Sequence, residues 1–163
     1  MFWGVISRED PVCFTNATEE VKGLKVFGKI KTLKAQYYLE MLMHHSIPHL
    51  DRVNGERNAD AIFQQDGASI HTCGQLTAFF EREGIVVPSW PSNSPDLSPI
   101  ENVWGIMKAE LSLGEIETLE DLEDVVTRLW HEHCTPELCE KLHASVKARL
   151  EKVIQDDGYR TSY

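Results

Sequence analysis

Ala61-Ile62-Phe63-Gln64-Gln65-Asp66 and Ser94-Pro95-Asp96-Leu97-Ser98-Pro99-Ile100-Glu101-Asn102 are the two stretches that decide the fold. The first is an apolar run closed by an acid, which predicts a buried strand ending at Asp66. In the second, a loop rich in proline enters a helix. Glu101 then falls in the first helical turn, where the helix dipole favours a carboxylate.

The two acids at these ends suggest a shared chemistry. Thirty-four residues lie between Asp66 and Glu101. A carboxylate at a strand end and a carboxylate on a helix can converge on one divalent cation. Ligation by oxygen suits Mg²⁺ or Mn²⁺, which are ions used in phosphoryl transfer on nucleic acids. Taken singly, each residue is equally an ordinary strand-end acid or an ordinary first-turn glutamate.

Hydrophobic periodicity and turn residues predict the other elements. We expect strands over residues 2–7, 12–15, 24–30, 61–65 and 85–87, and helices over 32–45, 72–83, 119–133 and 136–155. Asn54 to Asn58 is predicted to be a polar loop, and Gly84 a left-handed helix stop. The strand-helix-strand order from 61 to 87 implies a parallel pair with a crossover helix. The sequence therefore predicts a mixed α/β fold, with one domain over 1–163.

The charge balance bears on the partner. The formal charge is −10 and the pI about 5.1, whereas phosphate contacts usually come from Lys and Arg. Acidic residues concentrate over 110–124, and five lysines lie between 22 and 34. Each run is either a solvated face or a binding surface. No apolar run reaches the length of a membrane span, and the start lacks the basic flank of a signal peptide. We therefore expect an intracellular protein without a membrane partner.

The spacing of the cysteine and histidine residues does not predict a zinc site. The cysteines are Cys13, Cys73, Cys134 and Cys139, and their spacing fits neither a zinc nor a disulfide framework. The cluster His131-Glu132-His133-Cys134 has metal-ligand residue types. Residues two apart on a helix do not face each other, so we predict ordinary helix surface there.

Two longer segments resemble the catalytic domain of mariner-type DDE transposases, of the Tc/mariner superfamily. They are Phe63-Gln64-Gln65-Asp66-Gly67-Ala68-Ser69-Ile70-His71-Thr72 and the stretch from Trp90-Pro91 through Ser94-Pro95-Asp96-Leu97 to Pro99-Ile100-Glu101-Asn102-Val103-Trp104. The family shows a QQD-x-A-x-x-H strand end and a WP-x-x-SPDL-x-PIEN-x-W loop, with 34 or 35 residues between its last two acids. Trp3 to Ser7 is similar to its second strand, and 142–163 to its last helix and tail.

The resemblance implies a ribonuclease-H-like fold in which Asp66 is the second catalytic acid and Glu101 the third. It also implies that these acids help to hold two Mg²⁺ (or Mn²⁺) ions for DNA cleavage and strand transfer. The expected partners are transposon ends and target DNA, in a paired, homodimeric complex and without a small-molecule cofactor. In a eukaryote the expected location is the nucleus.

One departure from the family keeps the function open. The family's first Asp lies on a strand upstream of the Trp-Gly segment, and this chain begins at Met1-Phe2-Trp3-Gly4. The resemblance therefore implies a sheet lacking its first strand, and an incomplete amino-terminal part. Asp10 is predicted to be only a turn residue. Three functions are compatible: an active transposase domain, an inactive transposon-derived fragment, or a protein-interaction module that uses the acids of 110–124.

Five further residues of these segments have predicted roles. His71 matches the family's histidine and is either site-supporting or DNA-contacting, or else packs at a helix start. Asn102 either donates to a phosphate, fixes the Glu101 carboxylate, or starts the helix. Trp104, like Trp90, is predicted to pack the loop onto the sheet. Asp96 is predicted to organise the loop as a hydrogen-bond acceptor.

Overall fold

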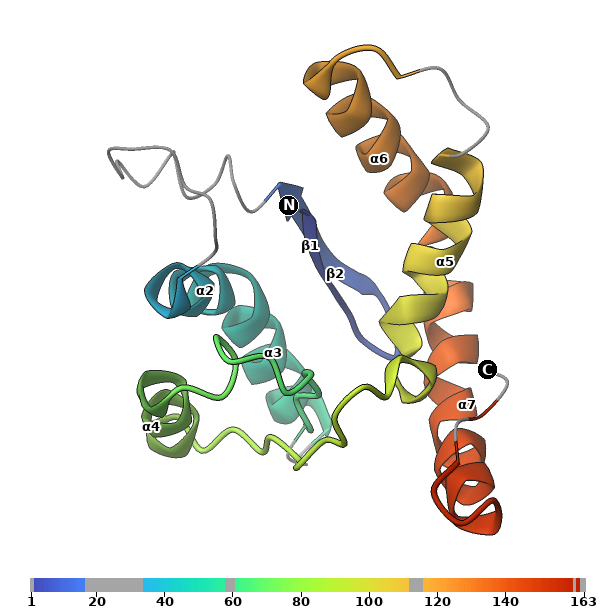
Figure 1. Ribbon diagram of the computed structural model, residues 1–163. Helices are drawn as coiled ribbons and strands as arrows, with labels where there is room; N and C mark the ends of the chain where they lie inside the picture. Colours follow the sequence, from blue (N-terminus) through green and yellow to red (C-terminus); the bar gives the residue numbers. More distant parts are fainter. Residues whose placement is uncertain (1, 17–33, 58–60, 112–115, 160, 162–163) are drawn as a thin grey trace. The chain divides into compact units, whose positions relative to one another are not determined.

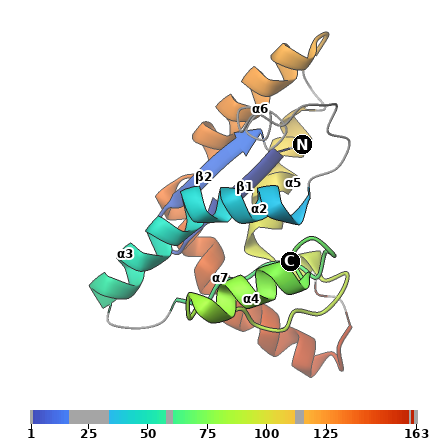
Figure 2. The same cartoon turned by 90° about the vertical axis from the view of Figure 1, so that its left-hand side faces the viewer.

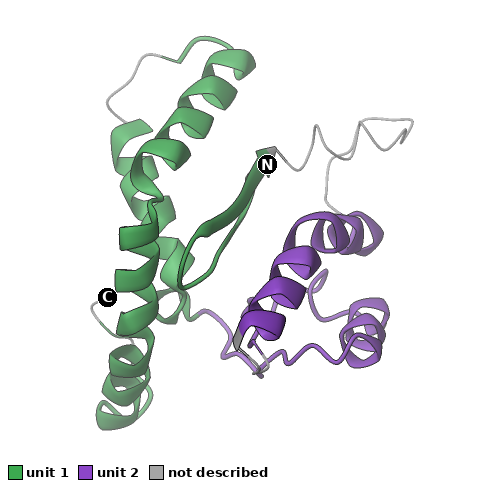
Figure 3. Cartoon of the chain, turned by 180° about the vertical axis from the view of Figure 1, so that it is seen from behind, with its two compact units in different colours: residues 1–16, 94–163 green, residues 17–93 purple. Residues whose placement is uncertain are grey.

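The computed structural model describes residues 2–16, 34–57, 61–111, 116–159 and 161. The chain forms two compact units, one made of residues 1–16 and 94–163 and the other of residues 17–93 (Figure 3). The strand predicted over 24–30 lies outside the described residues.

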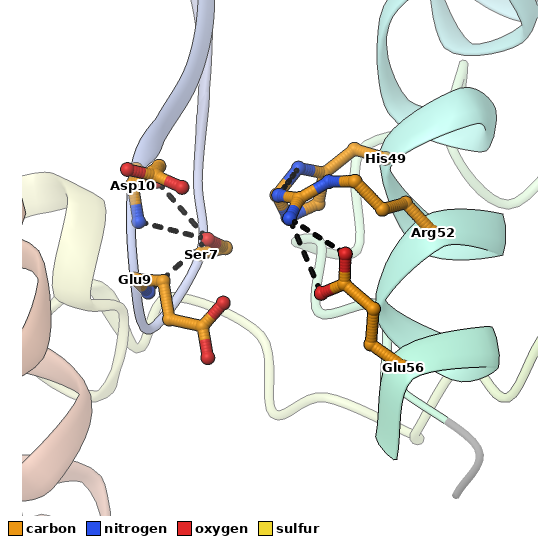
Figure 4. A network of polar contacts seen from close by, with 6 residues as sticks. All are labelled: Ser7, Glu9, Asp10, His49, Arg52 and Glu56. Atoms are coloured by element: carbon orange, nitrogen blue, oxygen red, sulfur yellow. Dashed lines mark hydrogen bonds and ion pairs between the residues drawn. The ribbon is translucent and has the colours of Figure 1, made fainter. Parts of the chain in front are cut away.

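The first unit begins with the predicted hairpin. Strand β1 (Phe2–Ile6) pairs antiparallel with β2 (Pro11–Asn16), and the register shifts between Val5 and Ile6. Ser7 holds the turn, because its backbone N–H donates to the Asp10 carbonyl over 2.8 Å and its Oγ accepts from the backbone N–H of Asp10 over 3.1 Å (Figure 4). Asp10 is thus a turn residue, as predicted.

Three long helices complete this unit (Figure 1). A short 3-10 turn, η2 (Pro95–Leu97), precedes α5 (Pro99–Leu111), α6 (Leu119–His133) and α7 (Pro136–Gln155). Helices α6 and α7 have the predicted bounds because their caps are strong. Thr118 and Asp121 form a capping box, while Thr135 caps α7 ahead of a proline in its first turn. Within the described residues, no helix combines the length and the apolar character needed to cross a membrane.

Aromatic packing joins the hairpin to these helices. The ring of Phe14 lies 4.9 Å from that of Trp130 and 6.1 Å from that of Trp104, between centroids. A Cβ on Gly4 would come within 3.0 Å of both indoles, so the missing side chain lets β1 lie close to them. Trp104 therefore packs against the sheet, as predicted. The buried cluster beneath consists of Val103, Met107, Val126, Leu129, Trp130, Cys134, Cys139 and Leu142.

The first described element of the second unit is a helix longer than predicted. Helix α2 (Ala35–Met41) runs through a π-helical turn, η1 (Leu42–Ser46), into α3 (Ile47–Arg57), without a break in Figure 2. The expected end near His45 was wrong. Pro48 lacks an N–H and its ring crowds the preceding turn, which a widened π turn accommodates without ending the helix.

The predicted polar loop was also wrong. Asn54 to Arg57 form the last turn of α3, and Asn58 lies outside the described residues. The polar residues are used within the helix: Arg52 pairs with Glu56 over 3.3 Å one turn later (Figure 4), and Asn54 Oδ1 accepts the backbone N–H of Ala61 over 2.7 Å. Such pairs at a spacing of four stabilise helices, so the polar composition did not indicate a loop.

The parallel pair exists but is much shorter than predicted. Ile62 and Val86 form a single parallel bridge, and the Phe63 N–H donates to the Val86 carbonyl over 2.8 Å. The expected buried strand over 61–65 was wrong for Ile62, which is 66% exposed, although Phe63 is buried. Helix α4 (Gly74–Arg82) supplies the predicted crossover. Gly84 at φ +66° is the predicted left-handed stop.

Candidate metal-binding residues

Asp66 follows shortly after the bridge between Ile62 and Val86, and its side chain is 70% exposed. Its Oδ1 accepts the backbone N–H of Ala68 over 3.0 Å and lies 2.6 Å from Nδ1 of His71. Among the described residues, nothing hydrogen-bonds to Oδ2. One oxygen of this carboxylate is therefore engaged by the protein.

A tight turn brings His71 back to Asp66. The Ala68 carbonyl accepts from the backbone N–H of His71 over 2.8 Å and from that of Thr72 over 3.1 Å. The imidazole is only 18% exposed and packs on the ring of Tyr38, with centroids 4.3 Å apart. This geometry favours the site-supporting reading of His71, and the DNA-contacting reading stays a prediction.

Two residues that the sequence analysis passed over complete this network. Tyr38, 2% exposed on α2, donates from its hydroxyl to Gln65 Oε1 over 2.9 Å. Gln65 Nε2 in turn donates to the His71 carbonyl over 3.1 Å. The sequence analysis predicted a helix over this segment, and no sequence signal distinguished Tyr38 within it. Gln65, adjacent to Asp66 in the quoted motif, was the available clue.

Glu101 occupies the first turn of α5, as predicted, with an exposed side chain. Its backbone N–H donates to the Ser98 carbonyl over 3.1 Å. No described residue forms a hydrogen bond or ion pair with its carboxylate. The next residue, Asn102, is held: its Oδ1 accepts from Nη2 of Arg149 over 2.7 Å. Asn102 thus anchors the helix that carries Glu101.

Arg149 also ties down the loop before Glu101. It is 2% exposed and donates from Nη1 to the Asp96 carbonyl over 2.7 Å and from Nε to Ser145 Oγ over 2.8 Å. Asp96 Oδ2 accepts both the N–H and the hydroxyl of Thr161, over 2.7 and 2.9 Å. Asp96 is therefore the loop-organising acceptor that was predicted.

Asp66 and Glu101 belong to different units, and their convergence on one ion stays a prediction. Within the described parts of each unit, no three His, Cys, Asp or Glu side chains are grouped to hold a metal. The donor chemistry nevertheless fits a hard cation. Each acid has an exposed side chain and offers a carboxylate oxygen of the kind that Mg²⁺ and Mn²⁺ prefer.

Two further acids and two thiols are used within the fold. Glu110 pairs with Nε2 of His133 over 2.9 Å, and Asp121 completes the α6 capping box. Cys134 and Cys139 are buried with their sulfurs 3.9 Å apart. Burial, with the neighbouring Cys139 thiol, raises the pKa of Cys134 far above its ordinary value, and burial raises the pKa of Cys139 as well. Both sulfurs therefore stay protonated at neutral pH.

Comparison with known proteins identifies the family. The profile described as DDE superfamily endonuclease matches residues 10–123, a span that includes both Asp66 and Glu101. The chain belongs to the DDE superfamily endonucleases. This DDE endonuclease chain is 29% identical over 140 residues to the Tc3 transposase of Caenorhabditis elegans, which covers 85% of the chain and 40% of that relative. The chain spans about two fifths of the length of the curated relatives it matches.

Solved structures establish the fold of this DDE endonuclease. The catalytic domain of Mos1 mariner transposase superposes with a TM-score of 0.79 at 19% identity, covering 99% of this chain and 76% of that one. The Mos1 mariner paired end complex with Mn superposes with a TM-score of 0.78 at 18% identity, and the match covers 99% of this chain and 44% of that one. The predicted α/β, ribonuclease-H-like fold and the mariner-type resemblance are confirmed.

Proposed function

We propose that this chain is the catalytic domain of a DNA transposase, which cleaves DNA and transfers strands with divalent metal ions during transposition. The family match over residues 10–123 carries the proposal, because it spans the two exposed acids. The local position of each acid supports the proposal. Asp66 follows a strand-like bridge, and Glu101 lies in the first turn of a helix anchored by a buried arginine.

Asp66 and Glu101 are the proposed ligands for two Mg²⁺ or Mn²⁺ ions. Such ions, when bound, activate a water or a 3′-hydroxyl and stabilise the leaving oxygen at a DNA phosphate. The protein residues would hold these ligands in place. His71 and Ala68 fix one oxygen of Asp66, and Asn102 with Arg149 fixes the start of α5 beneath Glu101.

Transposon ends and target DNA are the proposed partners, and a homodimer the proposed assembly. The similarity to Mos1, whose solved structures include a paired end complex with Mn, supports both. The net charge of −10 weighs against DNA binding away from the site, whereas cations held by Asp66 and Glu101 would offset the negative charge locally. A nuclear location would follow in a eukaryotic host.

A nicking assay tests the proposal. Supercoiled plasmid would be incubated with the chain and Mn²⁺, alongside Asp66→Asn, Glu101→Gln and, as a matched control, Glu81→Gln on the exposed surface of α4. We expect the wild type and Glu81→Gln to nick alike, and the two site variants to lose nearly all nicking. Wild-type nicking no faster than that of Asp66→Asn would overturn the proposed activity for this chain.

A further inference from the structure

We propose that Tyr38 and Gln65 are positioning residues that determine, through His71, which oxygen of Asp66 is presented to the metal ion. The protein holds Oδ1, and Oδ2 is the metal-binding oxygen. This inference rests on the proposed function of Asp66 and adds two residues outside the acidic set.

The network starts from a buried anchor. Tyr38 is 2% exposed and lies beside the fully buried Met41 and Leu42 of the same helical segment. Its hydroxyl donates to Gln65 Oε1 over 2.9 Å. Because the tyrosine ring is fixed by packing, this hydrogen bond restricts the Gln65 amide to one orientation, with Nε2 toward the His71 carbonyl at 3.1 Å.

His71 is consequently held at three points. Gln65 holds its carbonyl, Ala68 holds its N–H over 2.8 Å, and Tyr38 packs against its ring with centroids 4.3 Å apart. A carboxylate oxygen only accepts hydrogen bonds, so Nδ1 at 2.6 Å from Asp66 Oδ1 carries a proton. The network therefore holds the imidazole in place, and the contact with Asp66 keeps the proton on Nδ1.

The position of His71 makes the two oxygens of the Asp66 carboxylate different. Asp66 Oδ1 receives the Nδ1–H of His71 and the N–H of Ala68, whereas Oδ2 has no hydrogen-bond partner among the described residues. A carboxylate that is 70% exposed would otherwise rotate freely and would lose this freedom on binding an ion. Outer-shell partners of this kind are typically worth about 10- to 100-fold in metal affinity.

Two variants test the chain of contacts. Tyr38→Phe removes the hydroxyl but keeps the ring on His71, and Gln65→Glu keeps an acceptor for Tyr38 but loses the donor to the His71 carbonyl. Tyr37→Phe removes a hydroxyl from the adjacent buried tyrosine and serves as the matched control. Mn²⁺ affinity would be measured by electron paramagnetic resonance, and the His71 tautomer by nitrogen-15 NMR of the imidazole.

We expect Tyr38→Phe and Gln65→Glu each to weaken Mn²⁺ binding by about 10-fold and to change the His71 imidazole spectrum. Tyr37→Phe should change neither. Wild-type affinity in both network variants, with binding lost in Asp66→Asn, would overturn this inference and leave the proposed function standing. Wild-type affinity in Asp66→Asn would instead overturn the proposed function together with the inference. If Tyr38→Phe fails to fold, Gln65→Glu alone decides.

Discussion

Arg149 on α7 donates a hydrogen bond to the side chain of Asn102, the residue after Glu101, with 2.7 Å between guanidinium nitrogen and amide oxygen. The same guanidinium donates to the Asp96 carbonyl over 2.7 Å and is 2% exposed. The start of α5 is thus fixed by a residue 47 positions later in the chain. The orientation of Glu101 depends on the docking of α7 through this contact.

Replacing Arg149 by Met should destabilise the first unit strongly. The change leaves the Asp96 carbonyl and the Asn102 amide without a buried donor, for an expected loss of about 3 kcal/mol in the free energy of unfolding. Urea unfolding followed by tryptophan fluorescence would measure it, because Trp104 and Trp130 lie in that unit.

Arg128→Met is the matched control for this experiment. Arg128 pairs with Glu132 on the surface of α6 with its side chain 61% exposed, and such pairs contribute about 0–1 kcal/mol. Equal unfolding midpoints for the Arg149 and Arg128 variants would contradict the anchoring role of Arg149.

Gly4→Ala should be destabilising by about 1–3 kcal/mol, since its Cβ would overpack a filled site. The new carbon would lie 3.0 Å from atoms of Trp104 and Trp130, both large rings. Gly105→Ala on α5, where a Cβ meets nothing within 4 Å, should instead stabilise by about 0.5–1 kcal/mol because alanine favours helix. Thermal unfolding of the two variants measures both changes: we expect a lower unfolding temperature for Gly4→Ala and a higher one for Gly105→Ala. A shift of both unfolding temperatures in the same direction would refute the packing argument.

The capping box of α6 predicts a pH effect with a definite sign. Hydrogen bonds from the side chain and backbone of Thr118 lower the pKa of Asp121 from its ordinary value of 3.8. A lowered pKa in the folded state means that the stabilisation is present above pH 3.8 and is lost as the pH falls through the folded value.

Thr118→Ala should therefore raise the pKa of Asp121 toward 3.8, because the side-chain hydrogen bond of Thr118 is lost. Carboxyl NMR titration measures this shift directly. Thr135→Ala, which removes the cap of α7, is the control and should leave the Asp121 titration as in the wild type. An unchanged Asp121 titration in Thr118→Ala would show that the side-chain contact is not the cause.

Thiol reactivity should divide the cysteines into two classes. Cys13 and Cys73 are partly exposed, whereas Cys134 and Cys139 are buried and burial raises the pKa of both. Because the thiolate is the reacting species, we expect iodoacetamide to modify the buried pair at least about ten times more slowly. Peptide mass spectrometry gives the four rates, which should become similar in denaturant. Similar rates in the native protein would contradict the burial of the α6–α7 junction.

Local signals in the sequence were sufficient where a few adjacent residues determine the structure. The bounds of α6 and α7 follow from Thr118, Thr135 and the proline after Thr135, which act within one helical turn. The end of α3 was mispredicted because polar residues at 54–57 serve equally in a loop or on an exposed helix face. The strand at 61–65 was overestimated because strand length depends on pairing partners, and within the described ranges Ile62 is bridged to Val86 alone.

The residues of the candidate site also fall into those that local sequence signals predicted and those that depend on distant contacts. Asp66 and Glu101 were found because each is an acid at a recognisable element boundary within a family motif. Tyr38 and Arg149 were missed because their roles rest on contacts between residues 27 and 47 positions apart. From its residue type alone, Tyr38 is expected to be a buried ring and Arg149 a surface cation. The hydrogen-bond partners of each became visible only in the tertiary structure.

The hydrogen bonds from Thr161 to Asp96 tie the loop before Glu101 to the segment that follows α7. Thr161 is 7% exposed and supplies two donors to the loop that leads into Glu101. Without Thr161 the Asp96 carboxylate would be buried without those donors. The geometry of the loop that leads into Glu101 therefore depends on a residue 65 positions further along the chain than Asp96.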